Sequence, residues 1–207
     1  MLSGLIGKKL GIVQVFEENG SATAMTAIGA GPCFVTQIKT LDEEGYNAVQ
    51  LGFGETKRLN SPRKGHLKGV GHQLKHLREF SVDDPKSVKV GEKIDVDIFK
   101  PGDMVDITGI SKGKGFAGGV KRHHFSGGPK THGQTDRHRA PGSIGATTFP
   151  GRVLKGTRMA GHMGNSRVTQ RNLKVVQADP DRHLLLVRGA VPGAVNGLLV
   201  IKRSKKG

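Results

Sequence analysis

The positive charge of this chain lies in its second half. Residues 1–106 carry fourteen Lys and Arg against fourteen Asp and Glu, whereas residues 107–207 carry nineteen against three. Between residues 111 and 167 a single acid, Asp136, faces eleven Lys and Arg, and thirteen of the fifty-seven residues are glycine. Such a segment is too poor in apolar side chains to offset the entropy that ordering it would cost. We therefore expect it to need a polyanionic partner, and nucleic acid has the matching charge density.

Length, composition and net charge limit the classes of protein to which this chain can belong. The 207 residues suit one domain with a projecting segment, or two small domains. The net charge of +16 indicates a polyanionic partner such as nucleic acid, and a membrane surface is the other candidate. No run of eighteen apolar residues is present, and the N-terminus lacks the apolar core of a secretory signal. We therefore expect no membrane span. The single cysteine, Cys33, excludes an internal disulfide and a multi-cysteine zinc site, and indicates a cytosolic protein.

The sequence outside the basic segments has the pattern of β-strands. Short runs rich in β-branched residues alternate with turn signals, such as the Asn-Gly that ends residues 17–20 and the acidic run at 42–45. The pattern predicts strands at 12–16, 23–28, 33–38, 46–53, around 78–80, at 88–94, 96–99 and 104–110, and again at 172–177, 184–187 and 198–201. Several short strands at close spacing favour a barrel or a sandwich.

Two basic segments interrupt this pattern. Residues 54–78 are rich in Lys, Arg, Gly and His, and we expect a loop or a partly helical insertion there. Residues 111–167 show no strand pattern, and only a short helix near 116–121 is expected within them. A structureless loop of this length does not fit inside a compact domain. We therefore expect a globular β-barrel domain from residues 1–110 and 168–207, and an extended basic loop at 111–167 that projects and folds on a partner.

A glycine motif in the basic loop has two interpretations. Residues 113–118 match the G-x-G-x-x-G pattern of dinucleotide sites, and Asp136 follows about twenty residues later. That site needs a strand–helix–strand unit, and residues 119–135 contain no second strand pattern. We therefore reject a nucleotide cofactor. The glycines instead allow backbone to approach phosphates closely, with charge supplied by Lys112, Lys114 and Lys121.

Histidines raise the alternative of a metal-dependent enzyme. Five fall in the basic loop: His123, His124, His132, His138 and His162. Imidazole is a common metal ligand, but the spacing matches no known ligand pattern and Asp136 is the one local carboxylate, so contacts to RNA are the favoured interpretation. Catalysis has no other support, because the basic half has no paired carboxylates and Cys33 lies in an apolar strand pattern typical of a buried, inert thiol.

Three phenylalanines, Phe116, Phe125 and Phe149, are interleaved with the basic residues. They either stack on bases or pack on the barrel or in an apolar niche of RNA. The sequence leaves both roles open, although the place of Phe149 beside Pro150 favours contact with the partner.

Five segments, in order along the chain, carry a family resemblance. They read GLIGKKLG at 4–11, SKGKGFAG at 111–118, THG at 131–133, HRAPGSIG at 138–145 and KGTRMAGHMG at 155–164. Together they resemble the ribosomal protein L-three family of the large ribosomal subunit, in its bacterial form. The resemblance runs nearly from end to end.

The resemblance implies a mainly β protein with a six-stranded barrel of the translation-protein type and a long extended loop. It implies a structural protein of the cytoplasmic ribosome that is no enzyme and needs no cofactor, metal, membrane or small-molecule substrate. It also implies binding to 23S rRNA near its 3′ end, a part in starting subunit assembly, and a loop that extends towards the peptidyl-transferase centre. Neighbouring proteins implied by the resemblance are L-fourteen and L-nineteen.

One position departs from the family pattern. Many bacterial members carry a methylated glutamine after the Gly-Ser-Ile-Gly motif, whereas here Gly145 is followed by Ala146, Thr147 and Thr148. We therefore expect that modification to be absent. Gln134 lies in a different part of the loop and does not take over the role.

The residues expected to bind rRNA combine three kinds of contact. Arginines offer a planar, weakly hydrated guanidinium, lysines act as point charges, and glycines let the backbone pass through narrow clefts. The predicted set is Lys112, Lys114, Lys121, Arg122, His132, Arg137, His138, Arg139, Gly142, Gly145, Phe149, Arg152, Lys155, Arg158, His162 and Arg167. A non-ribosomal RNA- or DNA-binding module remains the other alternative.

Overall fold

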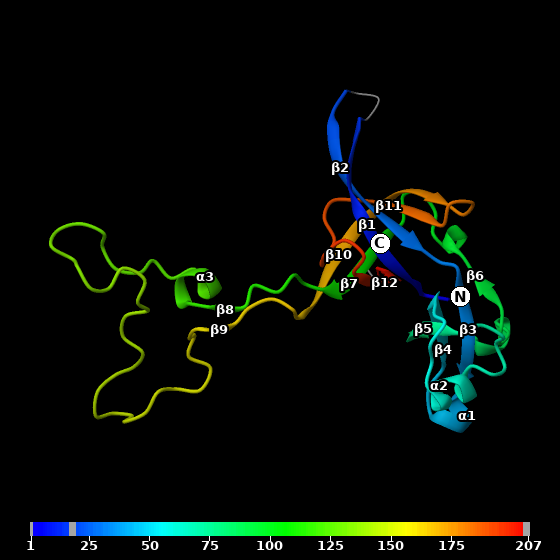
Figure 1. Ribbon diagram of the computed structural model, residues 1–207, viewed down its shortest axis with the longest axis horizontal. Coiled ribbons are helices and arrows are strands. Elements are labelled where there is room, and N and C mark those ends of the chain that lie inside the picture. Colours follow the sequence, from blue (N-terminus) through cyan, green and yellow to red (C-terminus); the bar gives the residue numbers. More distant parts are fainter. Residues whose placement is uncertain (1, 17–19, 205–207) are drawn as a thin grey trace. The chain divides into compact units, whose positions relative to one another are not determined.

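The computed structural model describes residues 2–16 and 20–204 of the chain (Figure 1). The chain divides into two compact units. Met1–Ser111 together with Arg167–Gly207 form the first, here named the barrel unit, and Lys112–Ser166 form the second, here named the arm. Within the described residues no helix has the length and apolar character needed to cross a membrane. Residues 17–19 of the expected hairpin turn lie outside the described residues.

Six antiparallel strands close a barrel in the order β1, β12, β7, β10, β11 and β2. Their bounds are Gly4–Phe16 for β1, Ala22–Ala30 for β2, Met104–Ile110 for β7, Arg167–Asp179 for β10, Leu184–Arg188 for β11 and Leu198–Arg203 for β12. The prediction of a mainly β protein with a six-stranded barrel is therefore confirmed.

The first barrel strand begins eight residues earlier than expected. Its start, at Gly4, pairs with Lys202 of β12, and a Cβ at Gly4 would collide with the carbonyl oxygen of Ile201 and the ring of Phe80. Glycine weakens a strand pattern in sequence. Here it permits the close approach that brings β1 into the barrel, which explains why the strand signal began only at residue 12.

A separate four-stranded antiparallel sheet has the order β5, β4, β3 and β6. These strands span Leu74–Ser81, Ala48–Glu55, Cys33–Lys39 and Lys93–Ile94, respectively. Two short helices, α1 at Leu41–Glu44 and α2 at Ser61–His66, connect its strands, and 3-10 turns η1 and η2 lie at Pro85–Ser87 and Val96–Ile98. Part of the expected barrel domain thus forms a sheet of its own within the barrel unit (Figure 1).

The barrel and the sheet share one apolar core. In β7, Val105 and Ile107 are buried while the polar residues between and after them are half-buried, as the alternation in the sequence predicted. These side chains belong to a continuous cluster of buried residues that also contains Leu51 and Phe80 of the sheet. Burial of one such side chain stabilises the folded chain by roughly 1.5–3 kcal/mol. The two layers therefore fold as one unit.

Two local predictions were wrong and two were right only in part. The expected turn at 42–45 is helix α1, which ends at Gly45 in the left-handed conformation with φ of 79°. The expected strand at 96–99 is the 3-10 turn η2, because the side chain of Asp95 accepts a hydrogen bond from the Val96 amide and starts a turn there. The basic insertion at 54–78 contains helix α2, in agreement with a partly helical insertion, but also the first five residues of β5. Of the strand expected at 88–94, only Lys93–Ile94 forms a strand, β6.

Asp95 links the sheet to the barrel through His183 and is also paired with Lys93 of its own sheet. Its carboxylate lies 2.7 Å from Nδ1 of His183, in the turn between β10 and β11, and 2.9 Å from Nζ of Lys93 in β6. Partial burial alone would raise the pKa of Asp95, but hydrogen bonds from Lys93 and His183 hold it below its usual value. The stabilisation from this cluster is therefore present near neutral pH and is lost as acid protonates Asp95.

We predict that shortening a buried side chain of the sheet destabilises the whole barrel unit, because the sheet shares the core of the barrel. Replacing Leu51, which is fully buried in β4, by Ala should lower the free energy of unfolding by about 3–5 kcal/mol, because a cavity is left. The matched control is Leu41→Ala, which removes the same atoms from a side chain that is 63% exposed and should change stability by less than about 0.5 kcal/mol. Urea denaturation measures both values. Equal effects would contradict the core described here.

Candidate nucleic-acid interface

The arm is the connection between two neighbouring barrel strands. Ile110 at the end of β7 pairs with Arg167 at the start of β10, so the chain leaves and re-enters the barrel at paired positions. Arg167, predicted as an RNA-binding residue of the loop, is therefore an exposed strand residue of the barrel unit.

A small sheet and a helix organise one part of the arm. Strand β8, Phe116–Ala117, pairs with β9, Gly161–His162, and next to this pair the Lys114 amide donates to the Met163 carbonyl at 2.9 Å. The helix α3 follows at Gly119–His123. It begins later than the expected helix at 116–121, because Phe116 and Ala117 are engaged in the strand pair. The glycine motif thus joins a strand to a helix, but the pairing is antiparallel and no dinucleotide fold is formed.

Two residues of α3 hold the returning chain at Met159. The guanidinium Nη1 of Arg122 donates to the Met159 carbonyl oxygen at 2.8 Å, and Nε2 of His123 lies 3.0 Å from the same oxygen. Because a carbonyl only accepts, Nε2 of His123 carries the proton in this contact. Arg122, predicted to bind RNA, is thus half-buried and at least partly a structural residue of the arm.

A second internal contact depends on two adjacent glycines. The Gly128 amide donates to the His138 carbonyl at 2.9 Å, and Nδ1 of His138 lies 3.2 Å from the Pro129 carbonyl oxygen. A Cβ at Gly127 would collide with the His138 carbonyl, and one at Gly128 with the Arg137 carbonyl. Only glycine permits this approach. These glycines were not among the residues predicted from the sequence, although a Gly-Gly pair followed by proline is a usable turn signal.

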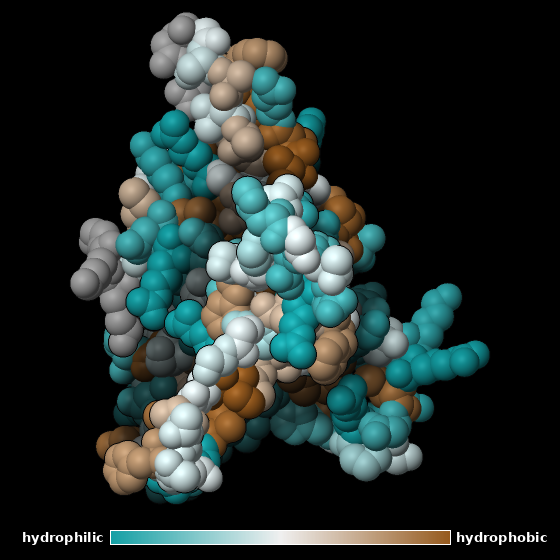
Figure 2. Space-filling view, turned by 90° about the vertical axis from the view of Figure 1, so that its left-hand side faces the viewer, coloured by the Kyte–Doolittle hydropathy of each residue, from teal (hydrophilic) through white to brown (hydrophobic). Residues whose placement is uncertain are grey.

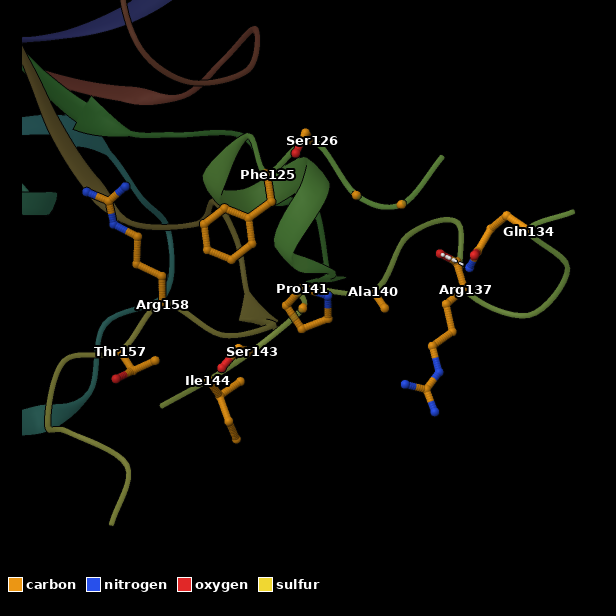
Figure 3. Close-up of a pocket in the computed structure, with 13 residues that line it drawn as sticks. Phe125, Ser126, Gln134, Arg137, Ala140, Pro141, Ser143, Ile144, Thr157 and Arg158 are labelled. Carbon is orange, nitrogen blue, oxygen red and sulfur yellow. Dashed lines mark hydrogen bonds between the residues drawn. The ribbon is translucent and has the colours of Figure 1, made fainter. Parts of the chain in front are cut away.

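Close by, the arm encloses an open hollow of about 550 Å³ (Figure 3). The Phe125 ring reaches from the end of α3 towards Pro141, and Ile144 lies on the same rim. Arg137 and Arg158 stand at opposite sides, and the Gln134 amide donates to the Arg137 carbonyl at 3.4 Å. Apolar surfaces beside guanidinium groups have the chemistry that suits a base together with its phosphate.

The three phenylalanines differ in exposure. Phe125 is half-buried and its ring lies against Gly119, so it packs within the arm itself. Phe116 is 80% exposed and Phe149 is 88% exposed. Exposed aromatic rings of this kind offer faces on which bases can stack.

Apart from Arg122, every predicted RNA-binding residue is exposed. Figure 2 shows one face of the molecule, on which hydrophilic and near-neutral residues predominate and hydrophobic ones form separate patches. Among the described residues, no Lys or Arg of the arm forms a salt bridge with a carboxylate. The arm's one acid, Asp136, instead accepts a hydrogen bond from the Thr135 hydroxyl at 3.1 Å. The positive charge of the arm is thus not compensated from within.

The described part of the chain contains no cluster of three or more His, Cys, Asp or Glu side chains placed to hold a metal ion. Two of the arm histidines, His123 and His138, face backbone carbonyl oxygens. In the barrel unit, Cys33 is buried, and burial raises the pKa of its thiol to about 12. Because the thiolate is the nucleophile, this cysteine is inert at neutral pH.

The sequence as a whole is similar to known proteins. Residues 79–183 match the model of a family described as Ribosomal protein L3. Three relatives carry the name "Large ribosomal subunit protein uL3". The one from Dehalococcoides mccartyi is 55% identical over 206 residues and covers 100% of both chains. That from Herpetosiphon aurantiacus is 55% identical over 208 residues, 100% of this chain and 98% of the relative. That from Roseiflexus sp. (strain RS-1) is 56% identical over 209 residues, 100% of both.

We predict that Arg122 rigidifies the paired strands of the arm. A hydrogen bond from a charged group contributes about 1.5 kcal/mol or more, so Arg122→Gln should speed hydrogen exchange at the Lys114 and Met163 amides about tenfold or more. The control is Lys121→Gln, an exposed neighbour on the same helix. Exchange measured by NMR should be unchanged in the control, and equal rates in both variants would show that Arg122 does not hold the returning chain.

Proposed function

The chain belongs to the ribosomal protein L3 family, and from this premise we propose that it is a structural constituent of the large ribosomal subunit, in the cytoplasm, where its arm binds rRNA. The observation that carries the proposal is the exposed and uncompensated positive charge of the arm. A polyanion that neutralises this charge releases its own counterions on binding, which favours the complex. The relatives' shared name places them in the large subunit and supports rRNA as that polyanion.

The mechanism we propose is recognition of RNA shape rather than of sequence. Arg137, Arg139 and Arg152 are exposed and can form forked hydrogen bonds to phosphates, because the guanidinium is planar. Glycines such as Gly142, which has φ of 83° and open space where a Cβ would lie, let the backbone follow a narrow RNA cleft. Phe149 supplies a stacking face beside these cations.

The arm has two parts in this proposal. Contacts around Arg122, Met159 and the β8–β9 pair organise the residues near both ends of the arm before RNA is present. The segment 129–155 contains no helix or strand, and we propose that it acquires its final conformation among rRNA phosphates. The glycines and positive charges that bind rRNA therefore lie mainly in residues 129–155.

Further parts of the proposal come from the family resemblance. We propose that the rRNA site lies near the 3′ end of 23S rRNA, that binding helps to start subunit assembly, and that the arm extends towards the peptidyl-transferase centre. The neighbours would be L-fourteen and L-nineteen. The chain itself would perform no catalysis, and the methylation found after the Gly-Ser-Ile-Gly motif in many relatives would be absent.

Co-sedimentation separates this function from its RNA-binding alternative. A structural protein should remain with large subunits through a gradient at high salt, whereas an accessory RNA-binding module should be washed off. Loss of the chain from salt-washed particles would contradict the proposal.

We predict that rRNA affinity depends steeply on salt and on the arm's arginines. Each phosphate contact contributes about 0.7–0.9 to the slope of log affinity against log salt, so the triple substitution R137Q/R139Q/R152Q should reduce that slope by about 2–3. The control is K86Q/K89Q/K100Q, which removes three exposed charges from the barrel unit. Filter binding to 23S rRNA over a salt series provides the slopes. A flat salt response of the unaltered protein would overturn the phosphate-contact mechanism.

We also predict that the arm can be shortened without unfolding the barrel unit. Replacing residues 130–154 by a short Gly-Ser linker keeps Phe125 and the β8–β9 pair, and the change in loop length should alter stability by less than about 1 kcal/mol. Thermal unfolding should therefore be nearly unchanged, whereas incorporation into large subunits should fall. An unfolded shortened protein would show that the removed segment supports the core.

A further inference from the structure

A second basic surface lies on the four-stranded sheet of the barrel unit. Residues 56–78 contain seven Lys and Arg and three His without a single Asp or Glu. This is a higher density of positive charge than in the segment 111–167, which has eleven Lys and Arg in fifty-seven residues. We name this segment, which includes α2 and most of β5, the sheet-side basic surface. All seven of its Lys and Arg are exposed: Lys57, Arg58, Arg63, Lys64, Lys68, Lys75 and Arg78.

The two acids that bracket this surface in sequence, Glu55 and Glu79, are paired with side chains other than its seven Lys and Arg. Glu55 lies 3.2 Å from Nδ1 of His72, and Glu79 lies 2.8 Å from Nζ of Lys39 and accepts from the Tyr46 hydroxyl at 2.9 Å. In the described residues, none of the seven Lys and Arg forms a salt bridge with a carboxylate. Their charge is therefore available to a partner.

The fold brings charges from α2 and β5 to one place. Arg63 of α2 lines a hollow of about 360 Å³ together with Lys75, His76 and Arg78 of β5. The position of α2 is fixed by the buried Leu67 that follows it and by a 2.8 Å contact between Nε2 of His66 and the side-chain oxygen of Gln50.

Two further observations describe the hollow. The guanidinium Nη1 of Arg78 donates to the Leu77 carbonyl at 2.8 Å, which restricts its orientation. Partial burial lowers the pKa of His76, and the charges of Lys75, Arg78 and Arg63 lower it further. The hollow is thus a site of positive potential.

The composition of the surface favours nucleic acid over protein as the partner. Interfaces with proteins depend on buried aromatic or large apolar anchors. Among the described residues, none of the large exposed hydrophobic side chains belongs to residues 56–78. Interfaces with nucleic acids are more polar and more positively charged. We propose that the sheet-side basic surface binds the phosphate backbone of an RNA duplex. It would be a second RNA site, formed by residues other than those of the arm.

The test compares charge removal on this surface with equal charge removal elsewhere in the full-length protein. The variant R63Q/K75Q/R78Q should reduce the salt slope for binding to an A-form RNA duplex by about 2–3. The control K86Q/K89Q/K100Q, from exposed positions of the same unit, should leave the slope unchanged. Circular dichroism and thermal unfolding confirm that each variant is folded.

A second readout uses the unaltered protein. Phosphates in the hollow would oppose the charges of Lys75, Arg78 and Arg63, so NMR titration should show the pKa of His76 rising when the duplex is added. Because no substitution is made, a folding defect cannot produce this result.

The outcomes separate this inference from the proposed function. If R63Q/K75Q/R78Q behaves like the control and His76 does not respond, while R137Q/R139Q/R152Q lowers the slope, the second site is overturned and the arm's role stands. That result would also fit an acidic protein as the occupant of the surface. If R63Q/K75Q/R78Q lowers the slope and R137Q/R139Q/R152Q does not, the proposed function of the arm is overturned and the second site stands.

Discussion

The shared apolar core is the interaction on which the rest of the molecule depends. It runs from the barrel residues Val105 and Ile107 to Leu51 and Phe80 of the four-stranded sheet, without a break between the two layers. A close approach at Gly4 admits β1 to this core, and the cluster around Asp95 joins the layers at another point. Because the barrel unit is stabilised in this way, the charges on its surface and in the arm need not contribute to folding. They are free to be arranged for binding.

Most of the fold was predictable because the relevant signals are local. Alternation of apolar and polar residues placed β7 at its observed bounds, and short apolar runs placed β11 and β12 nearly at theirs. The errors arose where tertiary contacts outweighed local pattern. The first part of strand β5 carries so much positive charge that the sequence indicated a loop there and a strand signal only around residues 78–80, whereas pairing with β4 extends the strand back to Leu74. Alternation cannot reveal which strands share a sheet, so the separate sheet could not be distinguished from the barrel in advance.

The arm shows a similar limit. Charge and glycine content distinguish it in the sequence as a cationic segment, since these properties are additive along a chain, and its Lys and Arg are exposed apart from the half-buried Arg122. Whether a given cation is used internally depends on what folds back onto it. Arg122 meets the Met159 carbonyl, thirty-seven residues away, and no local pattern signals that contact. The same holds for Gly127 and Gly128, whose need for small size comes from the backbone of residues 137–138.

The arm joins the barrel at a single pair of residues, so its length and sequence can change during evolution without altering the barrel. Ile110 and Arg167 occupy one rung of the β7–β10 ladder, so the register of the barrel does not depend on what is inserted between them. The entropy of closing a flexible loop grows only with the logarithm of its length, and a doubling adds about 0.6 kcal/mol. Insertions and deletions could therefore lengthen or shorten this segment, and recombination could exchange it for the equivalent segment of a relative, while the barrel stays intact.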